Sequence, residues 1–285
     1  MTDVSAKCHP PELFPSPMLK ERLLVLIPLI PAAVALVVAG GWLFTIAVIL
    51  MLALAGWEYW RMFTRGGYRP SAFILVAGPA SLAVLRYFYK FEFVDIWLVV
   101  VLFITLAIHL FEYEAGSQTS ALDFGISLGG ALYLGWLGAY FISIRNIPHG
   151  EWWLLLVLPS IWIADGGAYA IGRHLGFHKI SRRASPNKSW EGYIGGLVTA
   201  AICCPLIAMM WQLRAPEITP IKGLVLGVIL SLVCILGDLG ESMFKRYFNI
   251  KDSSNLIPGH GGIFDRIDSW LWAVPIGYYL TQFWK

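Results

Sequence analysis

The residues best suited to chemistry lie close together near the end of the chain, between Ser242 and Asp268. Only 14% of the 285 residues are charged, yet this stretch combines cations, acids, a histidine and glycines. They are Lys245, Arg246, Lys251 and Arg266; Asp252, Asp265 and Asp268; His260; and Gly259, Gly261 and Gly262. Cations neutralise phosphate, carboxylates bind a hard divalent ion, and glycines let backbone N–H groups approach an anion. The stretch therefore indicates phosphate chemistry.

A polar helix face leads into this stretch. Its members fall at i, i+3, i+4, i+7 and i+8, which is one stripe of a helix: Asp238, Glu241, Ser242, Lys245 and Arg246. Two acids followed one turn later by two bases could simply neutralise each other. We favour a metal–phosphate site, because the loop that follows ends in further carboxylates where the next apolar run begins.

Asp165 lies at the end of another apolar run. A carboxylate in a membrane span costs about 2.5–3.5 kcal/mol on insertion scales and usually marks function. The alternative is an interfacial Asp165 that caps a helix beginning at Gly166. The nearby glycines suit close helix approach as well as they suit a ligand.

The loop at 174–192 holds a second basic segment. Pro186 fixes a turn there, and Lys188 between hydroxyl residues is suited to contact a phosphate. The remaining cations of the loop are typical of attraction to anionic lipid head groups, worth about 1 kcal/mol each: Lys179, Arg182 and Arg183.

Long apolar helices must position these residues. Hydrophobic residues make up 58% of the chain, and runs of about 18–22 apolar residues recur, each long enough to cross about 30 Å of hydrocarbon. The sequence predicts an all-α, polytopic integral membrane helical bundle with about nine transmembrane helices. We place the spans at roughly 22–40, 42–60, 71–89, 94–111, 121–144, 152–172, 192–213, 222–240 and 267–284. A tight hairpin at Gly40 separates the first two.

Three regions follow: a disordered tail at 1–17, N-terminal transmembrane helices at 18–150 and a C-terminal catalytic region at 151–285. With the N-terminus inside, the inner segments hold 15 Lys and Arg residues and the outer segments hold six. The positive-inside rule then predicts an active site on the cytoplasmic side of a bacterial-type inner or plasma membrane. The basic residues sit in membrane-facing loops, so no nucleic-acid partner is expected.

Four blocks occur in one order and resemble the phosphatidate cytidylyltransferases, or CDP-diacylglycerol synthases. They are Ala-Asp165-x-Gly-Ala-Tyr, Ser185-Pro-x-Lys-x-Trp-Glu-Gly192, Gly237-Asp-Leu-x-Glu-Ser242 and the run from Ser242 through Pro258-Gly-His-Gly-Gly-x-x-Asp265-Arg-Ile-Asp268. The resemblance covers the chain from about residue 160 onward; the N-terminal half matches only in hydropathy. The sequence departs from the family at three positions. Ser189 stands where a threonine is usual, Gly166 where a serine or threonine is common, and Ser254 where a glycine is common.

The resemblance implies that phosphatidic acid and CTP, bound within membrane lipid, give CDP-diacylglycerol and pyrophosphate with Mg²⁺ as cofactor. A phosphate monoester, with its second pKa of about 6, is largely dianionic at pH 7 and needs no general base. The barrier is then dominated by bringing two polyanions together, a task for metal-binding carboxylates and for Lys or Arg. A homodimer is compatible with the sequence, which does not set the oligomeric state.

We assign roles on this basis. The predicted catalytic residues are Lys188, Asp238, Lys245, Arg246, Asp265 and Arg266. The predicted metal ligands are Asp238 and Asp265, followed by Asp268 and Asp165. The predicted substrate contacts are Ser185, Ser189, Lys251, Asp252, Gly259, His260, Gly261 and Gly262. His260 is expected to donate a hydrogen bond to phosphate, with a structural role in a turn as the alternative.

Two other classes of protein fit less well. A CDP-alcohol phosphotransferase needs Asp-Gly-x-x-Ala-Arg, and the segment after Asp165 departs from this pattern at the alanine and arginine positions. A transporter would also place acids within spans, but it would not need a long loop of alternating bases and glycines.

Overall fold

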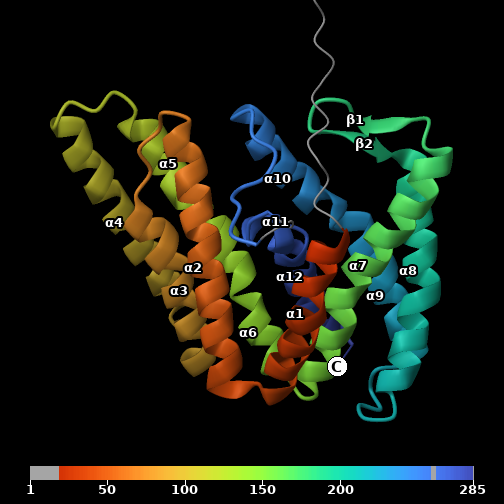
Figure 1. The fold of residues 1–285 in the computed structure, drawn as a ribbon. Helices are drawn as coiled ribbons and strands as arrows, with labels where there is room; N and C mark the ends of the chain where they lie inside the picture. The colour runs from red at the N-terminus through yellow and green to blue at the C-terminus, as the bar shows by residue number, and fades with distance from the viewer. Residues whose placement is uncertain (1–18, 258–260, 285) are drawn as a thin grey trace, which may run out of the picture.

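The computed structural model describes residues 19–257 and 261–284 (Figure 1), so the predicted tail, Gly259 and His260 lie outside the described residues. Seven helices are long and apolar enough to cross a membrane, which confirms a polytopic helical bundle. These helices are Gly41–Arg65, Ala72–Tyr89, Val94–Glu114, Ser120–Arg145, Gly150–Leu175, Trp190–Trp211 and Pro220–Tyr247. The first and ninth predicted spans correspond to helices α1 and α12.

Four helices open the bundle: α1 (Leu19–Ala39), α2 (Gly41–Arg65), α3 (Ala72–Tyr89) and α4 (Val94–Glu114). Gly40 joins α1 to α2 with a φ of +62°, a conformation that favours glycine. Arg145 closes the end of α1 from another helix, because its Nε and Nη2 donate to the carbonyls of Val37 and Val38 at 2.6 and 3.0 Å. The predicted hairpin is thereby confirmed.

The predicted span at 121–144 is built from three consecutive pieces. They are α5 (Ser120–Gly130), a π-helical segment η1 (Ala131–Trp136) and α6 (Tyr140–Arg145). Close packing accompanies the irregular segment: a Cβ on Gly135 would lie 3.0 Å from Cα of Pro79 on α3.

Helices α7 (Gly150–Leu175) and α8 (Trp190–Trp211) form an antiparallel pair joined by a short β-hairpin. Its strands β1 (Lys179–Ser181) and β2 (Ser185–Ser189) pair antiparallel. Sequence analysis predicted a turn at Pro186, which instead lies within β2, where its fixed φ suits an extended chain. Small residues bring the two helices together, and a Cβ on Gly196 would lie 2.5 Å from the Ala164 carbonyl oxygen.

The last helices are α9 (Pro220–Val233), α10 (Ile235–Tyr247), the short α11 (Phe264–Ile267) and α12 (Trp270–Phe283). The eighth predicted span, at 222–240, is built from α9 and the start of α10, and α10 continues past residue 240 with polar residues. At Gly237 the backbone of α10 approaches the next segment closely, since a Cβ there would lie 2.7 Å from the carbonyl oxygen of Asp268. This approach places the acids of α10 beside Asp268.

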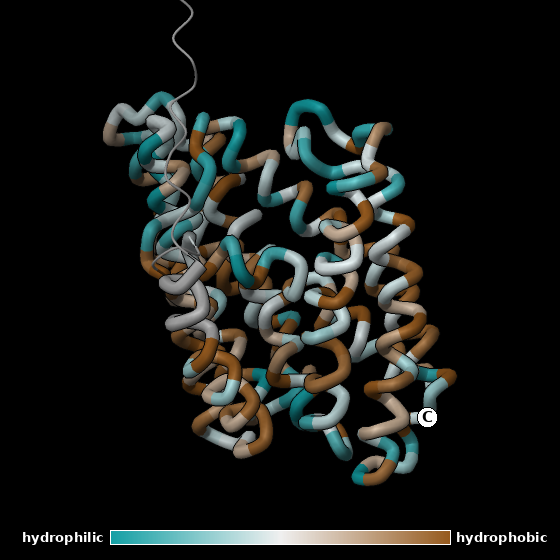
Figure 2. The backbone as a smooth tube through the Cα atoms, turned by 45° about the vertical axis from the view of Figure 1, so that its right-hand side comes forward, coloured by the Kyte–Doolittle hydropathy of each residue, from teal (hydrophilic) through white to brown (hydrophobic). Residues whose placement is uncertain are grey.

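One end of the bundle collects the α2–α3 and α4–α5 connections, the hairpin and the end of α10 (Figure 1). Hydrophobic residues run along the helices and hydrophilic ones gather at the connections (Figure 2). The chain returns from the end of α10 into the bundle, where α11 lies beside α2 and α12. Four of the segments that were predicted to lie on the inner side of the membrane therefore lie at the same end of the bundle, as that prediction requires.

Candidate active site

A cavity of about 630 Å³ opens between α7, the hairpin, α8 and the α9–α10 segment. Its polar lining comes from these elements and from the residue that precedes α12: Asp165, Tyr169, Arg173, Lys179, Ser185, Asn187, Lys188, Ser189, Tyr193, Ser231, Asp238 and Ser269. Its size is within the range of small-molecule sites. The cavity thus joins the three polar segments that sequence analysis singled out.

The hairpin and α10 are linked by an ion pair between Lys188 and Asp238. Their side chains are 26% and 29% exposed and both line the cavity, so the pair is open to a ligand. Sequence analysis assigned both residues to the site from segments 50 positions apart, and the structure brings them into contact.

Asp165 also lines the cavity, and it lies in the interior of α7. The alternative that it caps a helix starting at Gly166 is therefore wrong, because α7 runs without a break from Gly150 to Leu175. Gly172 serves packing, since a Cβ there would lie 3.3 Å from Cα of Gly192 on α8.

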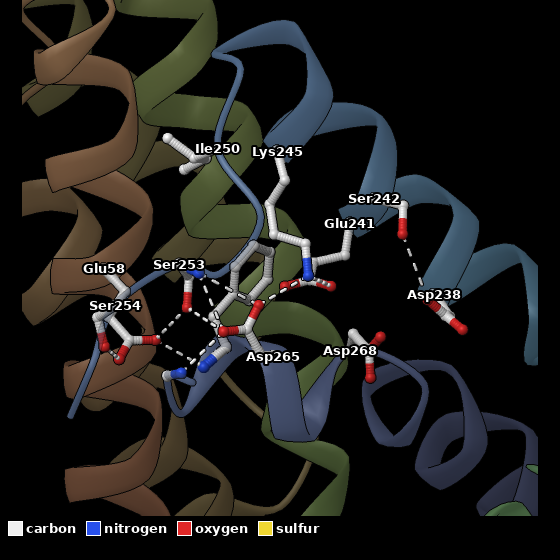
Figure 3. Close-up of polar contacts among 12 residues, drawn as sticks. Glu58, Asp238, Glu241, Ser242, Lys245, Ile250, Ser253, Ser254, Asp265 and Asp268 are labelled. Atoms are coloured by element: carbon white, nitrogen blue, oxygen red, sulfur yellow. Dashed lines mark hydrogen bonds and ion pairs between the residues drawn. The ribbon is translucent and has the colours of Figure 1, made fainter. Parts of the chain in front are cut away.

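Asp238, Glu241 and Asp268 form what we call the acid cluster (Figure 3). One carboxylate oxygen from each residue lies within 4.8 Å of the others. Glu241 is 1% exposed, and its Oε1 atom has no hydrogen-bond partner within the described residues. Hard oxygen ligands that converge in this way suit a divalent cation such as Mg²⁺.

Lys245 adjoins the acid cluster. Its Nζ atom lies 2.7 Å from Glu241 Oε2 and 2.8 Å from Asp265 Oδ1, joining α10 to α11. Glu241 and Lys245 of the polar helix face therefore neutralise each other, which agrees in part with the alternative that the acids and bases of this face pair among themselves. Asp238 instead pairs with Lys188, which comes from the hairpin.

Asp265 is surrounded by donors. Besides Lys245, its oxygens accept from the backbone N–H of Ser253 and, at 2.7 Å, from that of Gly262. Burial alone would raise the pKa of Asp265, but the charge of Lys245, the hydrogen bond from its ammonium and the Gly262 N–H hold this pKa below its usual value. The carboxylate is therefore ionised at neutral pH. Its assignment as a metal ligand stays a prediction.

Other predicted residues lie around this centre. Arg246 donates to the carbonyls of Ala184 in the hairpin and Ile250 after α10, at 3.4 and 3.1 Å. Ser189 accepts from the N–H of Gly192 at 3.2 Å and caps α8. Exposed positions are taken by Lys251, Asp252 and Arg266. Their substrate roles stay predictions.

The glycines after residue 260 were predicted to form a backbone cradle for phosphate. Gly261 adopts a φ of +79°, which favours glycine, and the N–H of Gly262 donates to Asp265. Within the described residues, this N–H therefore binds a carboxylate of the protein itself. A role of the glycines in phosphate binding stays a prediction.

Two functional candidates were not assigned by sequence analysis. Glu241 was recognised on the polar stripe but was given no metal role. Glu58 on α2 is fully buried and contacts the loop between α10 and α11. A signal for Glu58 exists in the sequence, because it is a carboxylate within an apolar span, the same argument that identified Asp165.

A helical membrane bundle with acids and cations around a common cavity is the architecture of a membrane-embedded enzyme of phosphate chemistry. The chain belongs to the cytidylyltransferase family, whose sequence profile it matches over residues 20–284. Among curated proteins it is similar to a phosphatidate cytidylyltransferase of Bacillus subtilis, 33% identical over 270 residues that cover 92% of this chain and 97% of that protein. Proteins of the same name from Pseudomonas aeruginosa and Synechocystis are 34% and 32% identical, covering 91% and 88% of this chain and 95% and 92% of their own lengths.

Proposed function

We propose that the chain converts phosphatidic acid and CTP to CDP-diacylglycerol and pyrophosphate, a step of phospholipid biosynthesis, at the cavity beside Lys188 and Asp238. The family and the names of the relatives support the reaction. The ion pair between these two residues is the observation that supports this location of the reaction, because it joins the hairpin to the acid cluster at the cavity wall.

A divalent cation fits the acid cluster, because one Glu241 oxygen is buried without a donor within the described residues. Asp238, Glu241 and Asp268 would hold Mg²⁺, with the predicted ligands Asp265 and Asp165 close by. When bound, the ion would neutralise phosphate oxygens and stabilise the charge of the transition state. Fixed carboxylates of this kind keep the ion in one place relative to the cavity.

The cations of the site complement the charge of the reactants. An oxygen of the phosphatidic acid phosphate attacks the α-phosphorus of CTP, a P–O bond forms, and the bond to the bridging oxygen breaks to release pyrophosphate. Lys188 at the cavity wall is placed to neutralise charge on the leaving group. Lys245 links Glu241 of the acid cluster to Asp265. The attacking oxygen is already deprotonated at pH 7, so the chain need not remove a proton.

The site faces the cytoplasm in this proposal. The connections that carry most Lys and Arg residues lie at the end of the bundle where the hairpin and the end of α10 lie (Figure 1). Short loops rich in these residues remain on the cytoplasmic side of bacterial membranes.

The direct test is the conversion of radiolabelled CTP and phosphatidic acid to a labelled liponucleotide by the purified full chain in detergent, with Mg²⁺ present or removed by chelation. We expect Mg²⁺-dependent product and an equal amount of pyrophosphate. A chain that makes no such product, but couples CDP-diacylglycerol to an alcohol, would belong with the CDP-alcohol phosphotransferases and contradict the proposal.

A further inference from the structure

Glu58 lies on α2, far in sequence from the residues of the site, and its side chain is fully buried. Each of its oxygens accepts two hydrogen bonds from the loop after α10 and the start of α11 (Figure 3). Oε1 accepts from Ser254 Oγ at 2.6 Å and from the Ile263 N–H at 3.0 Å. Oε2 accepts from Ser253 Oγ at 3.0 Å and from the Phe264 N–H at 2.7 Å. We call these four bonds the loop clamp.

The four donors come from both ends of the loop. Two serine hydroxyls precede the segment 255–262 and two backbone N–H groups follow it, so one carboxylate closes the loop on itself. Gly262 permits this closure, because a Cβ at that position would overlap both oxygens of Glu58 and Ser253 Oγ. The contact therefore depends on both sides: Glu58 supplies the acceptor oxygens, and Gly262 leaves the space that they occupy.

The loop clamp also sets the start of α11. The N–H groups of Ile263 and Phe264 open this helix, Asp265 is the next residue, and Asp268 follows one turn later. The buried Phe264 ring packs edge-on against Tyr59 of α2, at 6.1 Å between centroids. A shift of this start would move Asp268 of the acid cluster together with Asp265.

A second path leads from Glu58 to the site. Ser253 Oγ lies 3.0 Å from Glu58 Oε2 and 3.0 Å from Asp265 Oδ2, so its proton is shared between the two carboxylates. Asp265 in turn holds Lys245. The position of the Lys245 ammonium thus depends on the loop that Glu58 binds.

We infer that Glu58 is a positioning residue for cytidylyl transfer: through the loop clamp, α2 of the N-terminal half fixes Asp265 and Asp268 in their places at the active site. The inference rests on the proposed placement of the reaction at the acid cluster. A carboxylate is costly in a membrane span, so a helix that served only to anchor the chain would not need one.

Glu58→Gln tests the inference with little change of shape. The amide nitrogen cannot accept a hydrogen bond, so at least one of the two backbone N–H groups that open α11 loses its partner. We expect kcat at saturating CTP and phosphatidic acid to fall about 10–100-fold, the range typical when a residue that orients metal ligands is removed. The Kd for Mn²⁺, measured by electron paramagnetic resonance on the full chain without substrates, should rise over the same range.

Met62→Ala is the matched control. Met62 lies one turn beyond Glu58 on α2 and is 1% exposed, so its truncation lowers stability without removing a bond of the loop clamp. We expect a lower Tm with kcat and Mn²⁺ affinity per folded molecule unchanged. Equal losses of kcat and Mn²⁺ affinity in Met62→Ala and Glu58→Gln at matched Tm would reduce Glu58 to a structural residue and overturn the inference.

Ser254→Ala gives a second route if Glu58→Gln folds poorly. It removes one donor from Glu58 Oε1 and should lower kcat about 3–10-fold, less than the loss of an orienting residue. In a Glu58→Gln background the same substitution should have a smaller effect, because the two residues act through one bond. Wild-type kcat and Mn²⁺ affinity in both single variants would overturn the inference, and would leave the proposed reaction intact as long as the wild-type chain makes CDP-diacylglycerol.

Discussion

The loop clamp and the acid cluster are both built around a buried glutamate, Glu58 and Glu241, but they differ in how the carboxylate oxygens are satisfied. In the loop clamp, both oxygens of Glu58 accept hydrogen bonds from the chain. In the acid cluster, Glu241 Oε1 has no partner within the described residues, and the pair of Asp238 with Lys188 is open to the cavity. A carboxylate that the protein satisfies can hold structure, whereas one left unsatisfied is available to a ligand.

Electrostatics explains why the difference matters. Backbone N–H groups stabilise a buried carboxylate by charge-assisted hydrogen bonds. Carboxylates that converge repel one another, and burial penalises their charged form, unless a cation lies between them. Lys245 supplies part of this charge through Glu241. We therefore expect substitutions in the acid cluster to act on cation binding and chemistry, and substitutions in the loop clamp to act on alignment.

The largest effect is expected for Asp238→Asn. Asn keeps the shape but removes the charge that a hard cation and Lys188 both require. We expect turnover of CTP to fall on the order of 10³-fold, at the upper end of the losses seen when a preorganised electrostatic contact is removed. Asp95→Asn, an exposed position in the first turn of α4, should retain wild-type turnover. Near-normal activity of Asp238→Asn at ordinary Mg²⁺ would remove the acid cluster from the mechanism.

Lys188→Ala should lower kcat about 100-fold with little change of the KM for CTP. The reason is that an ammonium at the cavity wall is suited to charge that develops on the leaving pyrophosphate. Lys188→Arg should restore little of the lost kcat, because the planar guanidinium of arginine does not replace the compact charge of the lysine ammonium.

The control for Lys188 is Lys222→Ala, on α9 next to Trp284, which should behave as wild type in the same steady-state assay. An unchanged kcat in Lys188→Ala with a raised KM would show that Lys188 binds CTP in the ground state and would contradict a role in the transition state.

Gly262→Ala should disturb the loop clamp from the loop side. The added methyl would overlap Glu58 and Ser253, so the loop must shift, at a stability cost of about 1–3 kcal/mol. We expect a loss of kcat of about 10-fold, the lower end of the range for residues that orient a site. Gly240→Ala is the comparison, because a Cβ there meets no described atom within 4 Å. If the two variants match in Tm and kcat, Gly262 is not required for the fit to Glu58.

The smallest effect is expected for Arg246→Ala. Arg246 is exposed and donates to two backbone carbonyls, in the hairpin and after α10. Exposed polar contacts contribute about 0–1 kcal/mol, so we expect a change in kcat/KM of less than about 5-fold. A loss as large as that of Lys188→Ala would assign Arg246 to direct substrate contact.

Much of the architecture could be predicted from the sequence, because apolar length alone decides which segments span a bilayer. The signature blocks likewise placed Lys188 and Asp238 in one site before their contact was known. The β-hairpin could not be predicted, since β1 and β2 are short polar segments without a hydrophobic alternation. The short α11 was also missed, because its start depends on Glu58 from a distant helix.

The partners of Asp265 show the same limit. Its charge and its place in the signature predicted a metal ligand, but the sequence cannot tell which donors the folded loop presents to it. Lys245 reaches Asp265 from α10, and Ser253 and Gly262 reach it from the two ends of the loop that Glu58 binds. Long-range closure of this kind leaves no periodic pattern, so only the isolated carboxylate in an apolar span marks it.

Mn²⁺ binding to the full chain in detergent, without substrates, tests the central claim most directly, because it separates the acid cluster from the loop clamp before any chemistry occurs. The expected result is graded: Asp95→Asn binds as wild type does, Glu58→Gln binds about 10–100-fold more weakly, and Asp238→Asn shows no specific binding. Wild-type Mn²⁺ affinity in Asp238→Asn would contradict the account, because the acid cluster would then not be the site that holds the ion.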